Sequence, residues 1–121
     1  MNPVRVNQFP IVIYPSEDSA GGKFTAHCLS MDLVADDDSV EGAVSRLLHS
    51  IDDALAGAVK HNANVFREAP KEYWDRLANA QPLPAELLER IIFDANKRLG
   101  SGSELLVDVE KQCDLRQLQT A

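Results

Sequence analysis

The sequence predicts an α+β fold in which an antiparallel β-β-β-α unit is followed by two further helices and a last strand. Three observations lead to this prediction. Short apolar or alternating segments, separated by turn residues, occupy the region up to position 35. Two segments with helical periodicity follow, at 39–60 and 85–99. The length of 121 residues suits one hydrophobic core, so a single domain over 1–121 is expected.

The first expected strand covers 9–14, which is apolar throughout and has Pro10 near its start, where a missing donor disturbs a ladder least. The polar segment 15–22 ends in two glycines and predicts a turn. Segment 23–29 alternates, which predicts a half-buried second strand. One face of that strand would hold Phe24, Ala26 and Cys28, and the other Lys23, Thr25 and His27. Segment 33–35 predicts a short third strand.

The segment 39–60 carries both a helix start signal and an amphipathic pattern. Asp38 or Ser39 can cap the helix, and Glu41 stands three residues after Asp38, as in a capping box. At 100° per residue the apolar side chains form one broad stripe. The stripe comprises Val40, Ala43, Val44, Leu47, Leu48, Ile51, Leu55, Ala58 and Val59, whereas Ser45, Arg46, His49 and Asp53 face away. This helix is expected to cover one face of the sheet, completing a core unit over 7–61.

A helical insertion is expected over 62–103. It contains a short helix at 69–78 with proline in its first turn, a proline-rich break, and an amphipathic helix at 85–99 that a glycine ends. Segment 104–110 alternates like a final strand, and 111–121 is a weakly patterned tail.

The charge balance restricts the classes of partner. With 12 basic and 19 acidic side chains the net charge is −7, which argues against direct nucleic-acid binding and suits a basic protein partner. The longest apolar run, 11–14, is far too short for a membrane span, and no signal-peptide pattern opens the chain, so a cytoplasmic location is expected. Cys28 and Cys113 have no metal-site spacing and are expected to be reduced thiols.

Candidate reactive residues are few. The run 36–38 could supply carboxylates to a metal site, but a solvated turn with a helix cap is the favoured interpretation, since neighbouring carboxylates point in different directions. His27, His49 and His61 assemble no nucleophile, base and orienting group. His27 is the histidine on a strand, where surface decoration is favoured over a contact or titrating role. We therefore expect no catalytic residue, no metal site and no cofactor.

Three segments, 9–13, 22–28 and 38–43, resemble the HicB family of type II toxin–antitoxin systems. The family pattern has an aromatic-Pro-aliphatic strand, a strand of the type Gly-aromatic-x-Ala-aromatic-Cys and a capped helix of the type Asp-Thr-x-x-Glu-Ala. The corresponding residues here are 9–13, 22–28 and 38–43. The resemblance implies a truncated ribonuclease-H-like fold without the catalytic carboxylates, and a homo-oligomer, dimeric or larger. It also implies a protein that binds and occludes HicA, a small basic RNA-cleaving toxin.

The chain departs from the family pattern at three places. Residues 29–32 replace the usual Pro and Gly after the cysteine, and Asp37 stands where a glycine is usual. The region 62–103 is a helical insertion before the last strand at 104–110, so the order is helix, helix, strand rather than the strand, helix, helix of a ribbon-helix-helix domain. A DNA-binding autorepressor and a ribonuclease-H-like nuclease are therefore less favoured than an antitoxin.

Charge and exposure predict the residues that contact a partner, which are Glu17, Asp18, Asp32, Asp36 and Asp37. A possible oligomer interface consists of Tyr73, Trp74, Leu88 and Ile92, with core packing as the alternative for the two aromatic residues. A stand-alone HicB-like oligomeric scaffold without a toxin remains the alternative function, because the stripe over 87–99 exceeds what one small sheet face needs.

Overall fold

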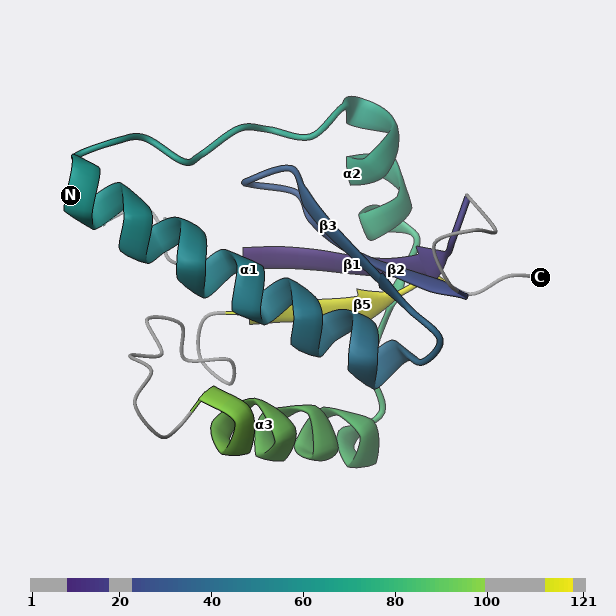
Figure 1. Ribbon diagram of the computed structural model, residues 1–121. Helices are drawn as coiled ribbons and strands as arrows, with labels where there is room; N and C mark the ends of the chain where they lie inside the picture. Colours follow the sequence, from purple (N-terminus) through teal and green to yellow (C-terminus); the bar gives the residue numbers. More distant parts are fainter. Residues whose placement is uncertain (1–8, 18–22, 100–112, 119–121) are drawn as a thin grey trace, which may run out of the picture.

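The computed structural model describes residues 9–17, 23–99 and 113–118, and it confirms the α+β class. The strands are β1 (Phe9–Pro15), β2 (Phe24–Cys28), β3 (Leu33–Asp37), β4 (Gln81–Pro82) and β5 (Cys113–Gln117), and the helices are α1 (Val40–His61), α2 (Lys71–Ala78) and α3 (Ala85–Leu99). Within the described residues the strands form one mixed sheet in the order β3-β2-β1-β5-β4. Figure 1 labels β1, β2, β3 and β5.

The sheet begins as the expected meander. β1 pairs with β2 and β2 pairs with β3, both antiparallel, and α1 follows β3 directly. The β-β-β-α prediction is therefore confirmed. On its other side β1 pairs in parallel with β5, and β4 pairs antiparallel with β5.

Helix α1 begins as its sequence predicts. The Ser39 hydroxyl accepts a hydrogen bond from the Gly42 amide at 3.0 Å and so satisfies one free donor of the first turn. The apolar stripe packs on the sheet as far as Leu55. The prediction that the stripe extends to Val59 is wrong. The Val59 side chain is 81% exposed, because the end of α1 extends past the strands (Figure 1).

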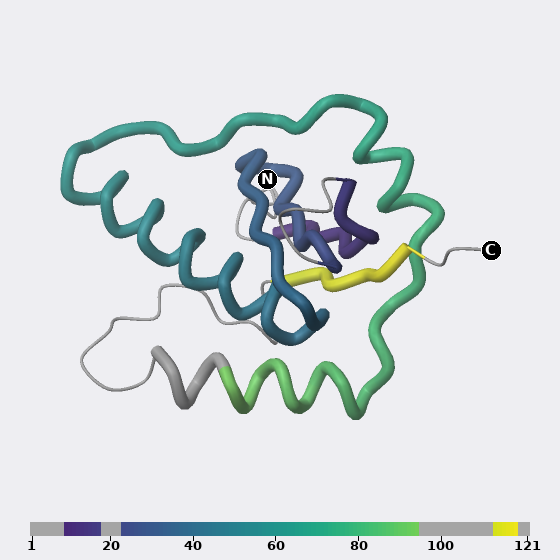
Figure 2. Tube along the Cα trace, turned by 45° about the vertical axis from the view of Figure 1, so that its right-hand side comes forward, coloured from purple at the N-terminus to yellow at the C-terminus, as the bar shows by residue number. Residues whose placement is uncertain are grey.

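Helices cover the sheet on both faces, which divides the core into two clusters. On one face α1 and α3 lie side by side over the larger cluster (Figure 2). Its fully buried side chains include Ile11, Ile13, Leu47, Leu48 and Ile51. On the opposite face α2 contacts β1 over a smaller cluster. That cluster holds Val12, Tyr14, Leu29, Ala69 and Ala80, with Tyr73, Trp74, Leu77 and Leu118 against it.

The second covered face corrects one expectation. Thr25 and His27 were predicted to lie on the solvent side of a half-buried strand, yet they are 6% and 2% exposed. The segment between α1 and α2 returns across this face and brings α2 over it. Two backbone bonds fix the return, from Arg67 N–H to the Ser30 carbonyl at 3.0 Å and from Ala69 N–H to the Leu29 carbonyl at 2.9 Å.

The final strand also differs from expectation. The predicted strand at 104–110 lies outside the described residues, and β5 instead falls in the region expected to be a weakly patterned tail. Leu115 is the buried residue of β5, so the apolar periodicity of this strand is weak. Pairing with β1, in the register Ile11 to Leu115, makes this segment a strand. Across the part of the chain that the structure describes, no helix is long and apolar enough to cross a membrane.

Candidate functional site

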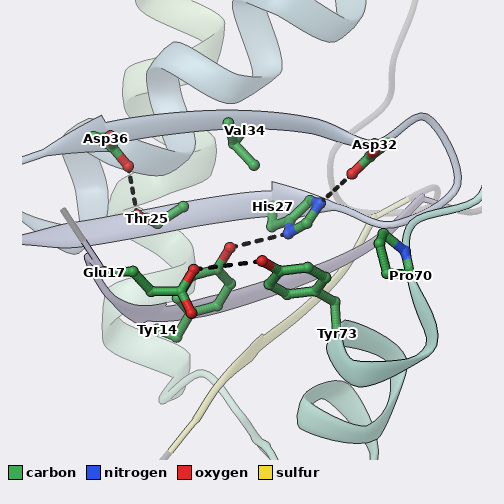
Figure 3. Close-up of a pocket in the computed structure, with 9 residues that line it drawn as sticks. All are labelled: Tyr14, Glu17, Thr25, His27, Asp32, Val34, Asp36, Pro70 and Tyr73. Carbon is green, nitrogen blue, oxygen red and sulfur yellow. Dashed lines mark hydrogen bonds and ion pairs between the residues drawn. The ribbon is translucent and has the colours of Figure 1, made fainter. Parts of the chain in front are cut away.

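The candidate site is an open pocket of about 470 Å³ on the sheet face opposite α1. Strands β1, β2 and β3 form its floor, and α2 with the residue before it forms one wall (Figure 3). The lining residues are Tyr14, Glu17, Thr25, His27, Asp32, Val34, Asp36, Pro70 and Tyr73.

Strand alternation puts these side chains on one face. In the antiparallel registers Tyr14 lies opposite Thr25, and Thr25 lies opposite Asp36. His27 and Val34 form the next pair along the sheet. Because successive side chains point to opposite faces, the residues between them belong to the apolar face under α1. The sequence pattern therefore builds a polar floor on the back of an apolar layer.

A hydrogen-bonded chain crosses the floor through His27. The His27 Nδ1 atom lies 3.0 Å from the Tyr14 hydroxyl, and Nε2 lies 2.8 Å from Asp32 Oδ1 (Figure 3). An ionised carboxylate only accepts, so we assign the Nε2–H group as the donor to Asp32. In the neutral ring Nδ1 then accepts from the tyrosine hydroxyl. Both nitrogens of a buried imidazole are thus satisfied, which fixes the ring and the position of Asp32.

A second polar pair stands beside the first. The Thr25 hydroxyl donates to Asp36 Oδ1 and lies 3.0 Å from the Ser16 hydroxyl. These bonds hold the Asp36 carboxylate against the floor. In both Asp32 and Asp36 the described bonds engage Oδ1. The second oxygen of each carboxylate can therefore accept a bond from a ligand.

A guanidinium group already occupies the aromatic corner of the site. The Arg76 carbon Cζ lies 4.6 Å from the ring centroid of Tyr14 and 4.9 Å from that of Tyr73. The Arg76 Nη2 atom donates to Glu17 Oε2 at 2.6 Å, and the Tyr73 hydroxyl donates to Glu17 Oε1 at 3.4 Å. The bond from Arg76 lowers the pKa of Glu17, and the same bond raises the pKa of Arg76.

The two tyrosines act as hydrogen-bond donors. Burial is the main cause of a strongly raised pKa at Tyr14, with the nearby Tyr73 and Glu17 adding to it. Burial likewise raises the pKa of Tyr73. A phenol that keeps its proton is a poor nucleophile. The Tyr14–His27–Asp32 chain has the order of a nucleophile, base and orienting group, but Tyr14 and His27 are only 4% and 2% exposed, which favours a fixed hydrogen-bonded floor.

The structure brings together three of the five predicted partner contacts, since Glu17, Asp32 and Asp36 line the pocket. Asp37 belongs to the opposite face, where its carboxylate pairs with Arg46 at 3.3 Å and accepts from the Ser39 amide at 3.4 Å. Asp18 lies outside the described residues. Asp36 and Asp37 thus diverge, which separates the carboxylates that a shared metal site in 36–38 would need.

The four residues predicted for an oligomer interface are at least partly used within the chain. Tyr73 and Trp74 pack against the cluster around Tyr14, and the Trp74 indole N–H donates to the Ala69 carbonyl at 3.1 Å. Leu88 and Ile92 pack against the larger cluster. Tyr73 and Trp74 are thus partly buried within the chain, and the oligomer interface stays a prediction.

Sequence reasoning missed the centre of the site. It assigned no site role to Tyr14 or Arg76 and placed His27 at the surface. One signal was available, because alternation puts Tyr14 on the face of the first strand that lacks Ile11 and Ile13, and puts His27 on the polar face of the second strand. Nothing in the sequence around α2 indicates that this helix supplies a wall of the pocket. The His27 and Tyr73 rings, 4.6 Å apart between centroids, come from segments far apart in the chain.

The described residues contain no group of three or more His, Cys, Asp or Glu side chains arranged to hold a metal ion. Both cysteines are thiols, and burial raises the pKa of Cys28, which lies within the larger core cluster. A buried thiol of this kind is a poor nucleophile at neutral pH.

Comparison with models of known protein families, with curated proteins and with solved structures finds no match for this chain.

Proposed function

We propose that this chain is a non-enzymatic, HicB-like antitoxin-type protein that binds and occludes a small basic RNA-cleaving toxin. The observation that carries the proposal is the pocket on the open part of the sheet, where Glu17, Asp32 and Asp36 converge. The arrangement β1, β2, β3 and α1 supports it, because the family resemblance implies such a unit.

The chemistry of the pocket suits a basic side chain. Arg76 provides an internal example, since its guanidinium lies over two tyrosine rings and pairs with Glu17. Asp32 and Asp36 stand on the other side of the pocket floor, oriented by His27 and Thr25. An arginine or lysine of a partner would find carboxylates that are already positioned, so little side-chain freedom is lost on binding. The net charge of −7 adds long-range steering toward a basic surface.

The non-enzymatic part of the proposal rests on the state of the polar groups. The tyrosine in the hydrogen-bonded chain keeps its proton, and His27 has both nitrogens engaged by protein atoms. A general base needs a free position that reaches the substrate. The mechanism is therefore steric and electrostatic: an acidic surface covers the RNA-binding face of the toxin.

The test is an RNA-cleavage assay with the product of a neighbouring reading frame that encodes a short basic protein of HicA type. The purified full chain is expected to bind that protein and abolish cleavage. The double variant Asp32→Asn, Asp36→Asn is expected to weaken binding by about tenfold or more at low salt, because it removes two oriented charges.

The double variant Asp53→Asn, Glu89→Gln provides the matched control, since it removes the same number of charges from exposed carboxylates on α1 and α3. It is expected to leave affinity unchanged. A toxin that is neither bound nor inhibited by the wild-type chain would refute the antitoxin proposal. Equal effects of the two variants would show that only net charge matters and would remove the pocket from the interface.

A stand-alone oligomeric scaffold is the second candidate, and one observation favours it. Helix α3 leaves Phe93 66% exposed, although its neighbours Leu88 and Ile92 are packed. A large exposed aromatic residue is a common interface anchor. Light scattering on the wild-type chain and on Phe93→Ser tests this candidate. A dimer that Phe93→Ser dissociates would support it, and a wild-type monomer would exclude it.

A further inference from the structure

The strand β3 ends the sheet, and within the described residues it pairs with β2 alone. The Leu29 amide donates to the Pro10 carbonyl, so odd-numbered residues of β2 direct their backbone groups toward β1. The intervening residues, such as Ala26, then bond β3 through partners such as Ala35. By the same alternation Val34 and Asp36 direct their N–H and C=O groups away from β2.

Such outward-directed groups form a template for an additional strand. The side chains of these residues lie on the pocket face (Figure 3). Along this face run a carboxylate at Asp32, an apolar side chain at Val34 and a carboxylate at Asp36. Val34 is 54% exposed, which is unusual for the middle residue of a strand beside a core. Val34 and Asp36 are separated by about 7 Å, the repeat of two residues in a strand. Asp32 lies in the turn before β3, where its φ is 52°. We call these three side chains the row.

We propose that the free edge of β3 binds an extended basic segment of a protein partner by strand addition. The partner residues facing the pocket would read basic, apolar, basic at two-residue spacing. The backbone of the partner pairs with Val34 and Asp36, and its basic side chains meet Asp32 and Asp36. This inference rests on the proposed function and names the element through which the basic partner docks.

Charge decides between a basic partner and a second copy of this chain. The segment 32–38 contains four aspartates and no basic residue. Antiparallel pairing of two such edges would bring the two acidic segments together, and like charges in adjacent strands destabilise pairing. A segment bearing arginine or lysine at alternate positions converts the same groups into cross-strand ion pairs. The row therefore selects a basic strand and opposes self-pairing.

The test uses the full chain and a blocked peptide, Thr-Arg-Thr-Val-Thr-Arg-Thr, with binding followed by calorimetry. Val34→Pro removes one outward N–H group while breaking no bond to β2 and changing no charge. It is expected to raise the Kd of the peptide by about tenfold, whereas the matched control Val34→Thr, which keeps the N–H group, stays close to wild type.

A second peptide, N-methylated at its central valine, loses the reciprocal donor and should bind the wild-type chain about tenfold more weakly. This arm decides the question even where Val34→Pro does not fold.

If neither backbone change affects Kd while Asp32→Asn and Asp36→Asn do, strand addition is wrong and the pocket still binds basic side chains. If Val34→Pro converts a dimer into a monomer, the edge is occupied by a second copy and the inference fails. Peptide binding without toxin binding would overturn the antitoxin proposal alone.

Discussion

Where β1, β2 and β3 form the sheet, its two faces carry different kinds of residue. The face under α1 and α3 is apolar from Ile11 and Ile13 through Ala26 and Cys28 to Ala35, with Asp37 at the end of β3 as a charged exception. The face under α2 is apolar at Val12 but polar at Thr25, His27 and Asp36. The first face is filled by helices, and the second is only partly covered. The comparison indicates that one face supplies stability and that the other carries the recognition site.

The largest expected difference in stability is between leucine-to-alanine variants on the two faces. Leu47 is fully buried under the sheet, so Leu47→Ala is expected to lower the free energy of unfolding by about 2–5 kcal/mol. Leu77 on α2 is only partly buried, and Leu77→Ala should lower it by no more than about half as much. Urea unfolding followed by circular dichroism measures both. Equal losses would show that the two clusters contribute alike, against the comparison.

The hydrogen-bonded floor allows the two faces to be distinguished at a single atom. Tyr14→Phe leaves the buried Nδ1 atom of His27 without its partner and is expected to cost about 1–3 kcal/mol. Tyr73→Phe loses only the long bond to Glu17 at the edge of the pocket, and should change stability by less than about 0.5 kcal/mol. Thermal unfolding of both variants distinguishes them. If Tyr14→Phe leaves the stability unchanged, another donor must replace the Tyr14 hydroxyl.

Helix α1 offers a smaller test, because its first turns pack against the sheet and its last turn does not. Nothing lies near a Cβ atom built at Gly57, so Gly57→Ala should raise the free energy of unfolding by about 0.5–1 kcal/mol. A Cβ atom at Gly42 would collide with the Asp37 carboxylate, so Gly42→Ala should gain less or lose stability. Chemical denaturation checks the order, and an equal gain at both positions would contradict it.

The smallest expected effect is the pH dependence of the stability that the ion pair between Glu17 and Arg76 contributes. The pKa of Glu17 is lowered from its ordinary value of 4.5, so its contribution to stability is complete above that pH and disappears as pH falls through the folded-state pKa. The stability difference between wild type and Glu17→Gln should therefore shrink as the pH falls below about 4.5. The exposed Glu89→Gln on α3 is the control. If the stability difference between the two proteins stays constant with pH, the ion pair between Glu17 and Arg76 contributes no stability.

Local pattern predicted the elements that depend on their own residues. Alternation in 23–29, the Ser39 cap and the stripe on α1 each need only neighbours in sequence, and the structure places β2 and α1 there. The pattern failed where an element depends on a distant partner. β5 has a single buried apolar residue, Leu115, and exists as a strand because β1 offers it a parallel edge.

The candidate site follows the same division. Glu17, Asp32 and Asp36 were predictable from charge, because acidic residues in turns and at strand ends are usually exposed. Their convergence on one face was not predicted, since Asp37 belonged to the same sequence cluster and lies on the other face. A clear third strand extending through Asp37 would have separated them by alternation alone.

The sequence by itself determined the α+β class, the meander with its covering helix and the acidic character of the molecule, because periodicity, caps and charge are local properties. Only the tertiary structure decided that the second sheet face is covered, that His27 is buried between Tyr14 and Asp32, and that β3 is the open edge. The physical reason is that burial and pairing depend on which distant segment returns to a surface. Here α2 returns over β1 and leaves the edge at β3 uncovered within the described residues.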